Sequence, residues 1–101
     1  MKPELINFVE KFKGKRILII GDMIADIYLK GDISRISREA PVLVLIESEE
    51  KTVAGGAANV VNNVATLGGK AFAVGILGED KGALNLNQIL EENNVNTEGM
   101  F

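Results

Sequence analysis

A glycine pair and an asparagine form the first group of residues that could take part in chemistry. Gly55 and Gly56 stand directly before a run of small residues that carries Asn59. Glycine lets a ligand approach the backbone, and the free N–H groups at the start of a helix bind hydroxyl or anionic oxygens. The amide of Asn59 offers a donor and an acceptor suited to a sugar hydroxyl. A simpler interpretation stays open, in which the glycines form a tight loop and Asn59 caps the helix.

Two aspartates form the second group. Asp22 and Asp26 closely follow the apolar segment Arg16–Ile20. A carboxylate just past the carboxyl end of a parallel strand lies in the crevice where α/β proteins bind ligands, and its two oxygens can accept two neighbouring sugar hydroxyls. The alternative is turn chemistry, because aspartate is common after a strand.

The third group is a pair of arginines, Arg35 and Arg38, in a polar segment between two β-prone runs. Arginines can clamp a phosphate through paired N–H donors. A solvated, charged loop is the alternative interpretation.

Composition narrows the chemistry further. The 101 residues carry a net charge of -3 and contain neither cysteine nor histidine. Disulfides, thiolate zinc sites and the usual general base are therefore excluded, and we name no metal ligand. The acidic balance argues against a nucleic-acid partner. No targeting segment or bilayer-length apolar run is visible, so we expect a cytoplasmic protein without a membrane partner.

Hydrophobic periodicity predicts an α/β fold with a small inserted sheet. In chain order we expect a helix over 3–13, a strand over 16–20, β-runs over 27–33 and 42–48, a helix over 57–67, a strand over 70–77 and a helix over 80–93. The continuous apolar character of 17–20 predicts burial on both faces, as in a parallel sheet. In the last helix Leu84, Leu86, Ile89 and Leu90 are expected to point inward. The chain should stop before a third parallel strand.

Taken together, these elements resemble the PfkB/ribokinase family of carbohydrate kinases. The family's first signature is matched by Gly55, Gly56, Ala57, Asn59, Gly68 and Gly78, with Val61 where a Ser, Thr or Ala is expected. The stretch from Gly31 to Val42, with Asp26 and Tyr28 before it and Asn63 after it, is similar to the branch that phosphorylates heptose 7-phosphate. The likeness covers nearly the whole chain.

The resemblance implies a sugar site and a lid. Asp26 would hold sugar hydroxyls, and Gly55, Gly56 and Asn59 would line the pocket, with Asp22 and Asn63 nearby. Residues 27–48 would form a β-lid that closes over the sugar and pairs with a second subunit's lid in a homodimer. Arg35, in that lid, would contact the substrate's phosphate.

The resemblance also implies what is missing. The family transfers the γ-phosphoryl group of ATP, with Mg²⁺, to a sugar hydroxyl, using an aspartate base in a later Gly-Ala-Gly-Asp motif. That motif does not occur here, so we assign no catalytic residue and no ATP or Mg²⁺ ligand. We expect residues 1–101 to be the N-terminal half of a ribokinase-like kinase domain, inactive alone. The alternatives are a non-enzymatic sugar-binding or dimerisation module, a piece of a split kinase, and a ribose or fructose kinase of the same family.

Overall fold

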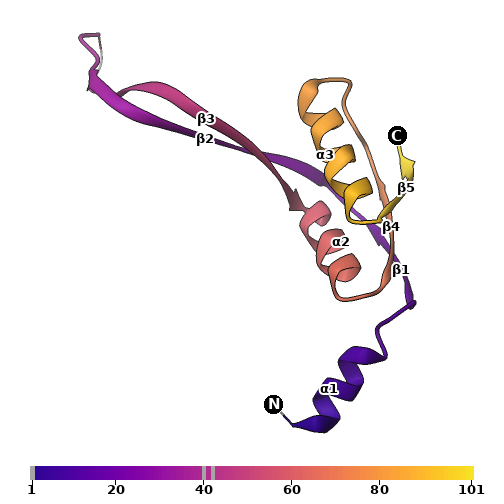
Figure 1. Cartoon of the computed structure of the whole chain (residues 1–101). Helices are drawn as coiled ribbons and strands as arrows, with labels where there is room; N and C mark the ends of the chain where they lie inside the picture. The colour runs from indigo at the N-terminus through magenta and orange to yellow at the C-terminus, as the bar shows by residue number, and fades with distance from the viewer. Residues whose placement is uncertain (1, 40, 42) are drawn as a thin grey trace.

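The chain folds into a small α/β layer from which a long hairpin and an N-terminal helix project (Figure 1). The computed structural model describes residues 2–39, 41 and 43–101, apart from the side chains of 34–36 and 43–47. In chain order the elements are α1 (Pro3–Glu10), β1 (Arg16–Ile20), β2 (Met23–Ile36), β3 (Leu43–Gly56), α2 (Ala57–Thr66), β4 (Lys70–Gly75), α3 (Lys81–Glu92) and β5 (Asn96–Met100). The predicted α/β class with an inserted β-element is confirmed.

A parallel three-stranded sheet in the order β1-β4-β5 forms the base of the fold. Leu18 of β1 is in register with Phe72 of β4, and Phe72 is in register with Asn96 of β5. The expectation that the chain stops before a third strand is therefore wrong. The polar sequence of β5 hid it, because strand 96–100 lacks the apolar run that marks β1 and β4.

Helices α2 and α3 cover one face of this sheet. The core between them is built from small and aliphatic side chains: Ala58, Val61, Ala71, Ala73, Leu86, Leu90 and Val95. Alternation along β4 buries Ala71 and Ala73 against the helices and turns Phe72 to the other side. The helices can approach closely because alanines, not larger residues, lie beneath them.

The opposite face of the sheet is open. Leu18 and Ile20 of β1 point to it and are 60% and 71% exposed. Burial of 17–20 on both faces, expected from its apolar run, is thus wrong, since no element of the described part of the chain covers that side. The buried side of α3 is also narrower than expected. Leu86 and Leu90 are buried, but Leu84, which was expected to point inward, is 71% exposed.

Strands β2 and β3 form a separate antiparallel ribbon of 14 residues each, longer at its base than the predicted runs. Two register shifts interrupt it, one between Lys30 and Gly31 and one between Ile33 and Arg35. At the first, the hydroxyl of Ser48 donates to the carbonyl of Lys30 at 3.0 Å. The extra residue of the bulge, Ser48, thus adds a side-chain hydrogen bond between the two strands.

The projecting elements make the molecule extended. Its radius of gyration is 18.4 Å, compared with about 13 Å for a compact domain of 100 residues. Its accessible surface is 7699 Å², well above the roughly 5,600 Å² that its mass predicts. Helix α1 contributes to this, because none of its residues is buried.

Candidate sugar-binding site

The carboxylate of Asp26 lies directly over the backbone of Gly55. Asp26 is on β2 and Gly55 near the end of β3, where Gly55 pairs with Ile24. A methyl group placed on Gly55 would lie 2.6 Å from Cγ of Asp26. Cβ atoms in proteins essentially never approach another heavy atom this closely. Gly55 is buried and Asp26 is exposed. The glycine thus leaves room for the carboxylate, whose oxygens remain open to a ligand.

Gly56 turns the chain from β3 into α2. Its φ of 56° lies in the left-handed region, and a methyl group there would meet the carbonyl oxygen of Asp22 at 2.6 Å. The same carbonyl accepts a hydrogen bond from the N–H of Ala57 at 2.9 Å. Gly56 is the N-cap residue of α2 and provides no side-chain cap. This tight turn places the start of α2 beside the base of the hairpin. Gly56 is needed for its positive φ and its close contact with Asp22, and Gly55 for the space that Asp26 fills.

Asn59 is the third residue of α2 and is exposed. Because Gly56 holds the N-cap position, the alternative that Asn59 caps the helix is not supported. Asn63 lies one turn further on, and its carbonyl accepts from the hydroxyl of Thr66 at 3.1 Å. The amide of Asn59 therefore stands in the first turn beside the glycine pair, with Asn63 one turn behind it.

Asp22 occupies a different position from Asp26. Together with Ile20, Val74, Ile76 and Phe101 it lines a cavity of 430 Å³ at the carboxyl ends of β1 and β4. This is the crevice that the strand order predicts for a ligand. The backbone carbonyl of Asp22 contacts the turn at Gly56 and Ala57, as described above, and its side chain is exposed.

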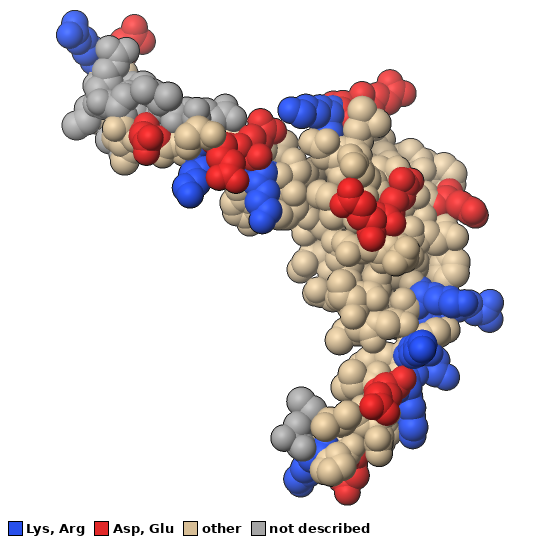
Figure 2. Space-filling view, in the orientation of Figure 1, with Lys and Arg blue, Asp and Glu red and all other residues tan. Residues whose placement is uncertain are grey.

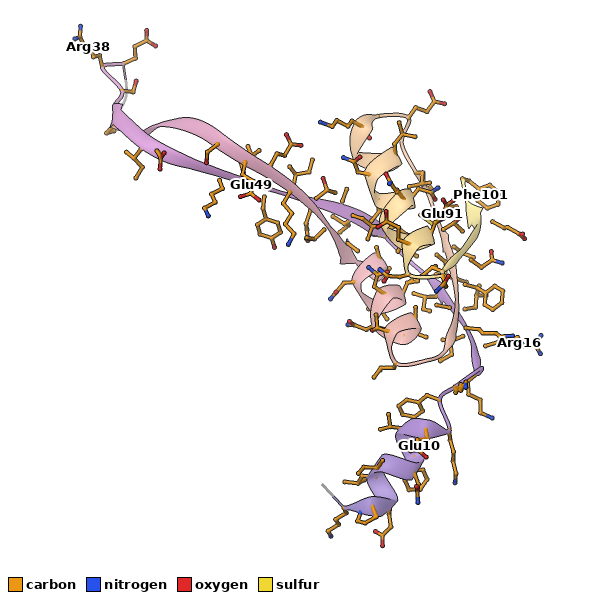
Figure 3. All side chains as sticks on the ribbon, in the orientation of Figure 1. Glu10, Arg16, Arg38, Glu49, Glu91 and Phe101 are labelled. Atoms are coloured by element: carbon orange, nitrogen blue, oxygen red, sulfur yellow. The ribbon has the colours of Figure 1, made fainter. Side chains whose placement is uncertain are left out.

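The arginines lie far from Asp26 along the hairpin. Arg35 pairs with Val44 on the backbone, and at about 3.3 Å per residue it is roughly 30 Å along β2 from Asp26. Its side chain lies outside the described part of the chain. Arg38 stands at the tip of the hairpin, far from α2 (Figure 3). Within one chain the structure therefore does not bring either arginine to the Asp26 carboxylate.

Two residues that the sequence did not mark as site residues share the face of Asp26. Val53 is directly opposite Asp26 in the ladder, and Tyr28, two residues along β2, is 61% exposed. Tyr28 places an aromatic ring next to the carboxylate, an arrangement suited to the apolar face of a sugar. Only the ladder register, which the bulges obscure in the sequence, could have identified Val53.

The described residues contain no group of three acidic, histidine or cysteine side chains arranged to hold a metal ion. They also include no phosphate-binding loop, so no residue of this part of the chain is assigned to ATP or Mg²⁺. No helix within the same residues is long and apolar enough to cross a lipid bilayer.

The glycine pair, the hairpin and the α/β layer agree with a known family. Residues 15–100 match the model of the pfkB family of carbohydrate kinases. The chain belongs to this family. Among carbohydrate kinase relatives it is 46% identical over 93 residues to the bifunctional protein HldE of Desulfatibacillum aliphaticivorans, covering 92% of this chain and 19% of that protein. The HldE protein of Helicobacter pylori strain P12 is 44% identical over 87 residues, with 86% and 19% covered.

Solved carbohydrate kinases share the fold. The chain superposes on Arabidopsis thaliana ribokinase, complexed with ribose and ATP, with a TM-score of 0.64 and 26% identity, covering 87% of this chain and 28% of that one. It superposes on a fructokinase from Xylella fastidiosa with a TM-score of 0.61 and 29% identity, covering 84% and 24%. The predicted ribokinase-like fold is confirmed. The chain spans about a fifth of the length of the curated relatives it matches.

Proposed function

We propose that this chain is the sugar-binding and lid portion of an ATP-dependent carbohydrate kinase whose substrate is a heptose 7-phosphate-like sugar. The observation that carries the proposal is the exposed Asp26 carboxylate held over Gly55, next to the first turn of α2. The substrate class rests on the likeness of the stretch 31–42 to heptose 7-phosphate kinases and on the HldE relatives.

In this role the chain binds and orients the sugar. Asp26 accepts hydrogen bonds from sugar hydroxyls, and Asn59 donates to or accepts from a third hydroxyl at the start of α2. In the complete reaction the acceptor oxygen bonds to the γ-phosphorus, the bond to ADP breaks and the hydroxyl proton passes to a base. Such reactions depend on positioning and charge stabilisation. The base, the ATP site and the Mg²⁺ site belong to sequence that this chain does not contain.

The open face of the sheet supports the proposal that this chain is a portion of a kinase domain and not a complete one. Leu18 and Ile20 present apolar side chains that are 60% and 71% exposed. In an α/β protein whose parallel sheet is covered on both faces, such side chains are buried. Residues 1–101 are thus the N-terminal half of the kinase domain in this proposal, and the half alone is inactive.

The hairpin supports a homodimer. Its two strands pair only with each other, so both outer edges offer N–H and C=O groups to a second copy. A lid-to-lid dimer would also explain the position of Arg35, since its roughly 30 Å separation from Asp26 lets it reach a partner's site and the phosphate bound there. Light scattering at micromolar concentration should therefore give twice the chain mass of 10.9 kDa.

An amide-resolved NMR titration tests the sugar site. Heptose 7-phosphate should shift the backbone signals of Gly55, Gly56 and Asn59, and Asp26→Asn should weaken this binding at least tenfold. Asp32→Asn, an exposed change further along the same strand, is the matched control and should bind normally. Equal affinity in both variants would overturn the proposed role of Asp26.

Two further measurements separate the alternatives. A coupled ADP-release assay with heptose 7-phosphate and MgATP should show no turnover by this chain, and clear turnover would refute the claim of inactivity. The ribokinase and fructokinase neighbours favour a neutral sugar as the second candidate. Ribose or fructose shifting the same NMR signals more strongly than heptose 7-phosphate would establish that candidate instead.

A further inference from the structure

Four side chains at the base of the hairpin share the face that carries Asp26. In the ladder Asp26 is directly opposite Val53, and Tyr28, two residues further along β2, is directly opposite Lys51. Directly opposite residues lie on the same face of a ribbon, and so do residues two apart along one strand. Asp26, Tyr28, Lys51 and Val53 therefore form one group, which we call the Asp26 patch.

The Asp26 patch faces away from α3. The two neighbours of Asp26 along β2, Ala25 and Ile27, line a cavity together with residues of α3. Because side chains alternate along a strand, the members of the patch point to the other face of the ribbon. Three of the four are exposed and Val53 is partly exposed. The patch is therefore accessible to a ligand in the described part of the chain.

The patch has an anion at one corner and a cation at the corner diagonally across. Asp26 and Lys51 are diagonal neighbours in the ladder, a relation that separates their Cβ atoms by about 7 Å. Tyr28 and Val53 occupy the other two corners and present an aromatic ring and an apolar side chain. This arrangement fits a ligand with hydroxyl groups at one end, C–H surface in the middle and an anionic group at the other end.

Lys51 has no charged residue directly opposite it. Lys30, the next lysine on the same face, is directly opposite Glu49, so those two charges offset each other. Lys51 is opposite the uncharged Tyr28 instead. Figure 2 shows both signs of charge along the hairpin, and Figure 3 places Glu49 midway along it. Among the described side chains of this face, the ammonium group of Lys51 is thus the cation closest to Asp26 in the ladder.

We propose that Lys51 binds the phosphate group of the substrate and so selects a phosphorylated sugar. This inference rests on the proposed sugar site at Asp26. When Asp26 holds the hydroxyl groups, its carboxylate repels the phosphate of the same ligand, and a nearby cation offsets that repulsion. Lysine binds phosphate as a point charge. Arg35 is roughly 30 Å away along the strand, whereas Lys51 serves the site of its own chain.

A comparison of phosphorylated and unphosphorylated ligands isolates the role of Lys51. In the NMR titration, Lys51→Gln should weaken binding of heptose 7-phosphate about fivefold, the effect expected of one exposed ion pair. The same variant should bind unphosphorylated heptose as the parent does. Lys51→Arg keeps the charge and should retain the preference for the phosphorylated sugar. Lys30→Gln removes a lysine from the same face and is the matched control, which should bind both ligands normally.

Three results would overturn the assignment. Equal losses for the two ligands in Lys51→Gln would indicate a structural effect and not a contact with phosphate. Equal losses of heptose 7-phosphate affinity in Lys51→Gln and Lys30→Gln would indicate a general attraction to positive charge. Loss of the phosphate preference in Arg35→Gln, with Lys51→Gln unaffected, would place the phosphate at the lid of a second subunit.

Inorganic phosphate separates this inference from the proposed sugar site. Compared with NaCl of equal ionic strength, phosphate should shift the backbone signals of Tyr28 and Lys51 in the parent but not those of Tyr28 in Lys51→Gln. If these shifts occur while heptose 7-phosphate leaves Gly55 and Asn59 unchanged, the sugar site is refuted and the phosphate contact stands. If heptose 7-phosphate binds through Asp26 but Lys51→Gln alters neither titration, the reverse holds. No shift with either ligand would refute both.

Discussion

The carboxyl group of Asp26 occupies the space that a side chain at Gly55 would need. A methyl group on Gly55 would lie 2.6 Å from Cγ of Asp26. The two residues come from different strands and are 29 positions apart in the printed numbering. Gly55 of the family signature and Asp26, the residue proposed to bind sugar, are therefore one structural unit, in which the absence of a side chain on Gly55 leaves room for the carboxylate.

Replacing Gly55 should consequently affect binding more than stability. Gly55→Ala collides with the carboxylate of Asp26, which is exposed and can turn away, so we expect the free energy of unfolding to change by less than about 0.5 kcal/mol. Affinity for heptose 7-phosphate should fall, because the carboxylate leaves its position. Urea denaturation and the NMR titration measure the two effects. Gly78→Ala is the control, because its nearest atoms are at 3.7 Å, and it should change neither quantity by much.

Gly56 can be compared with Gly68 to separate backbone strain from collision. Both have positive φ, at 56° and 99°, but only Gly56 would bring a methyl group within 2.6 Å of a backbone oxygen, that of Asp22. Gly68→Ala should lose about 1–2 kcal/mol from the left-handed conformation alone, and Gly56→Ala clearly more. If urea denaturation gave the same loss of unfolding free energy for both variants, the contact with Asp22 would be relieved without cost.

The start of α3 depends on Asp80. Its carboxylate accepts a hydrogen bond from the N–H of Ala83 at 2.9 Å. Asp80→Ala should therefore lower the free energy of unfolding by about 1 kcal/mol, the typical loss of an N-cap. Glu79→Ala, one residue earlier and outside the helix, is the control and should be nearly neutral. A thermal melt that ranks the two variants in the opposite order would contradict the capping role.

The two faces of the sheet should respond differently to substitution. Leu90 of α3 is fully buried against one face, whereas Leu18 of β1 is 60% exposed on the other. Leu90→Ala should lose about 2–5 kcal/mol, as core truncations do. Leu18→Ser should change stability by less than about 0.5 kcal/mol, as exposed positions do, and should reduce binding of the dye ANS. A large destabilisation by Leu18→Ser would mean that the open face is covered in solution.

The sequence was informative where local chemistry and tertiary structure agree. The glycine pair and Asp26 were singled out from the residues, and the structure brings Gly55 and Asp26 into contact. Their role in binding sugar stays a prediction. Strand β5 was missed because most of its residues are polar. It is held in the sheet by backbone pairing with β4, which leaves no apolar pattern in the sequence. Leu84 was placed inward because helical periodicity cannot show how far the sheet extends beneath α3.

The distance of Arg35 from Asp26 depends on how extended the chain is between them, which the spacing of the residues in the sequence does not show. Arg35 is nine residues beyond Asp26 in the sequence, and in a helix or a compact loop these residues would be near each other. In an extended strand they are roughly 30 Å apart.

The two bulges of the hairpin compensate each other. The first adds a residue to β3 at Ser48 and the second adds one to β2 at Ser34, so that Met23 pairs with Gly56, Arg35 pairs with Val44, and both strands are again equally long. Because each serine is the extra residue of its own bulge, deleting either codon alone would convert that bulge to regular pairing and leave the pairs on both sides of it in register. Either deletion, or both together, should therefore leave the ladder of the hairpin intact.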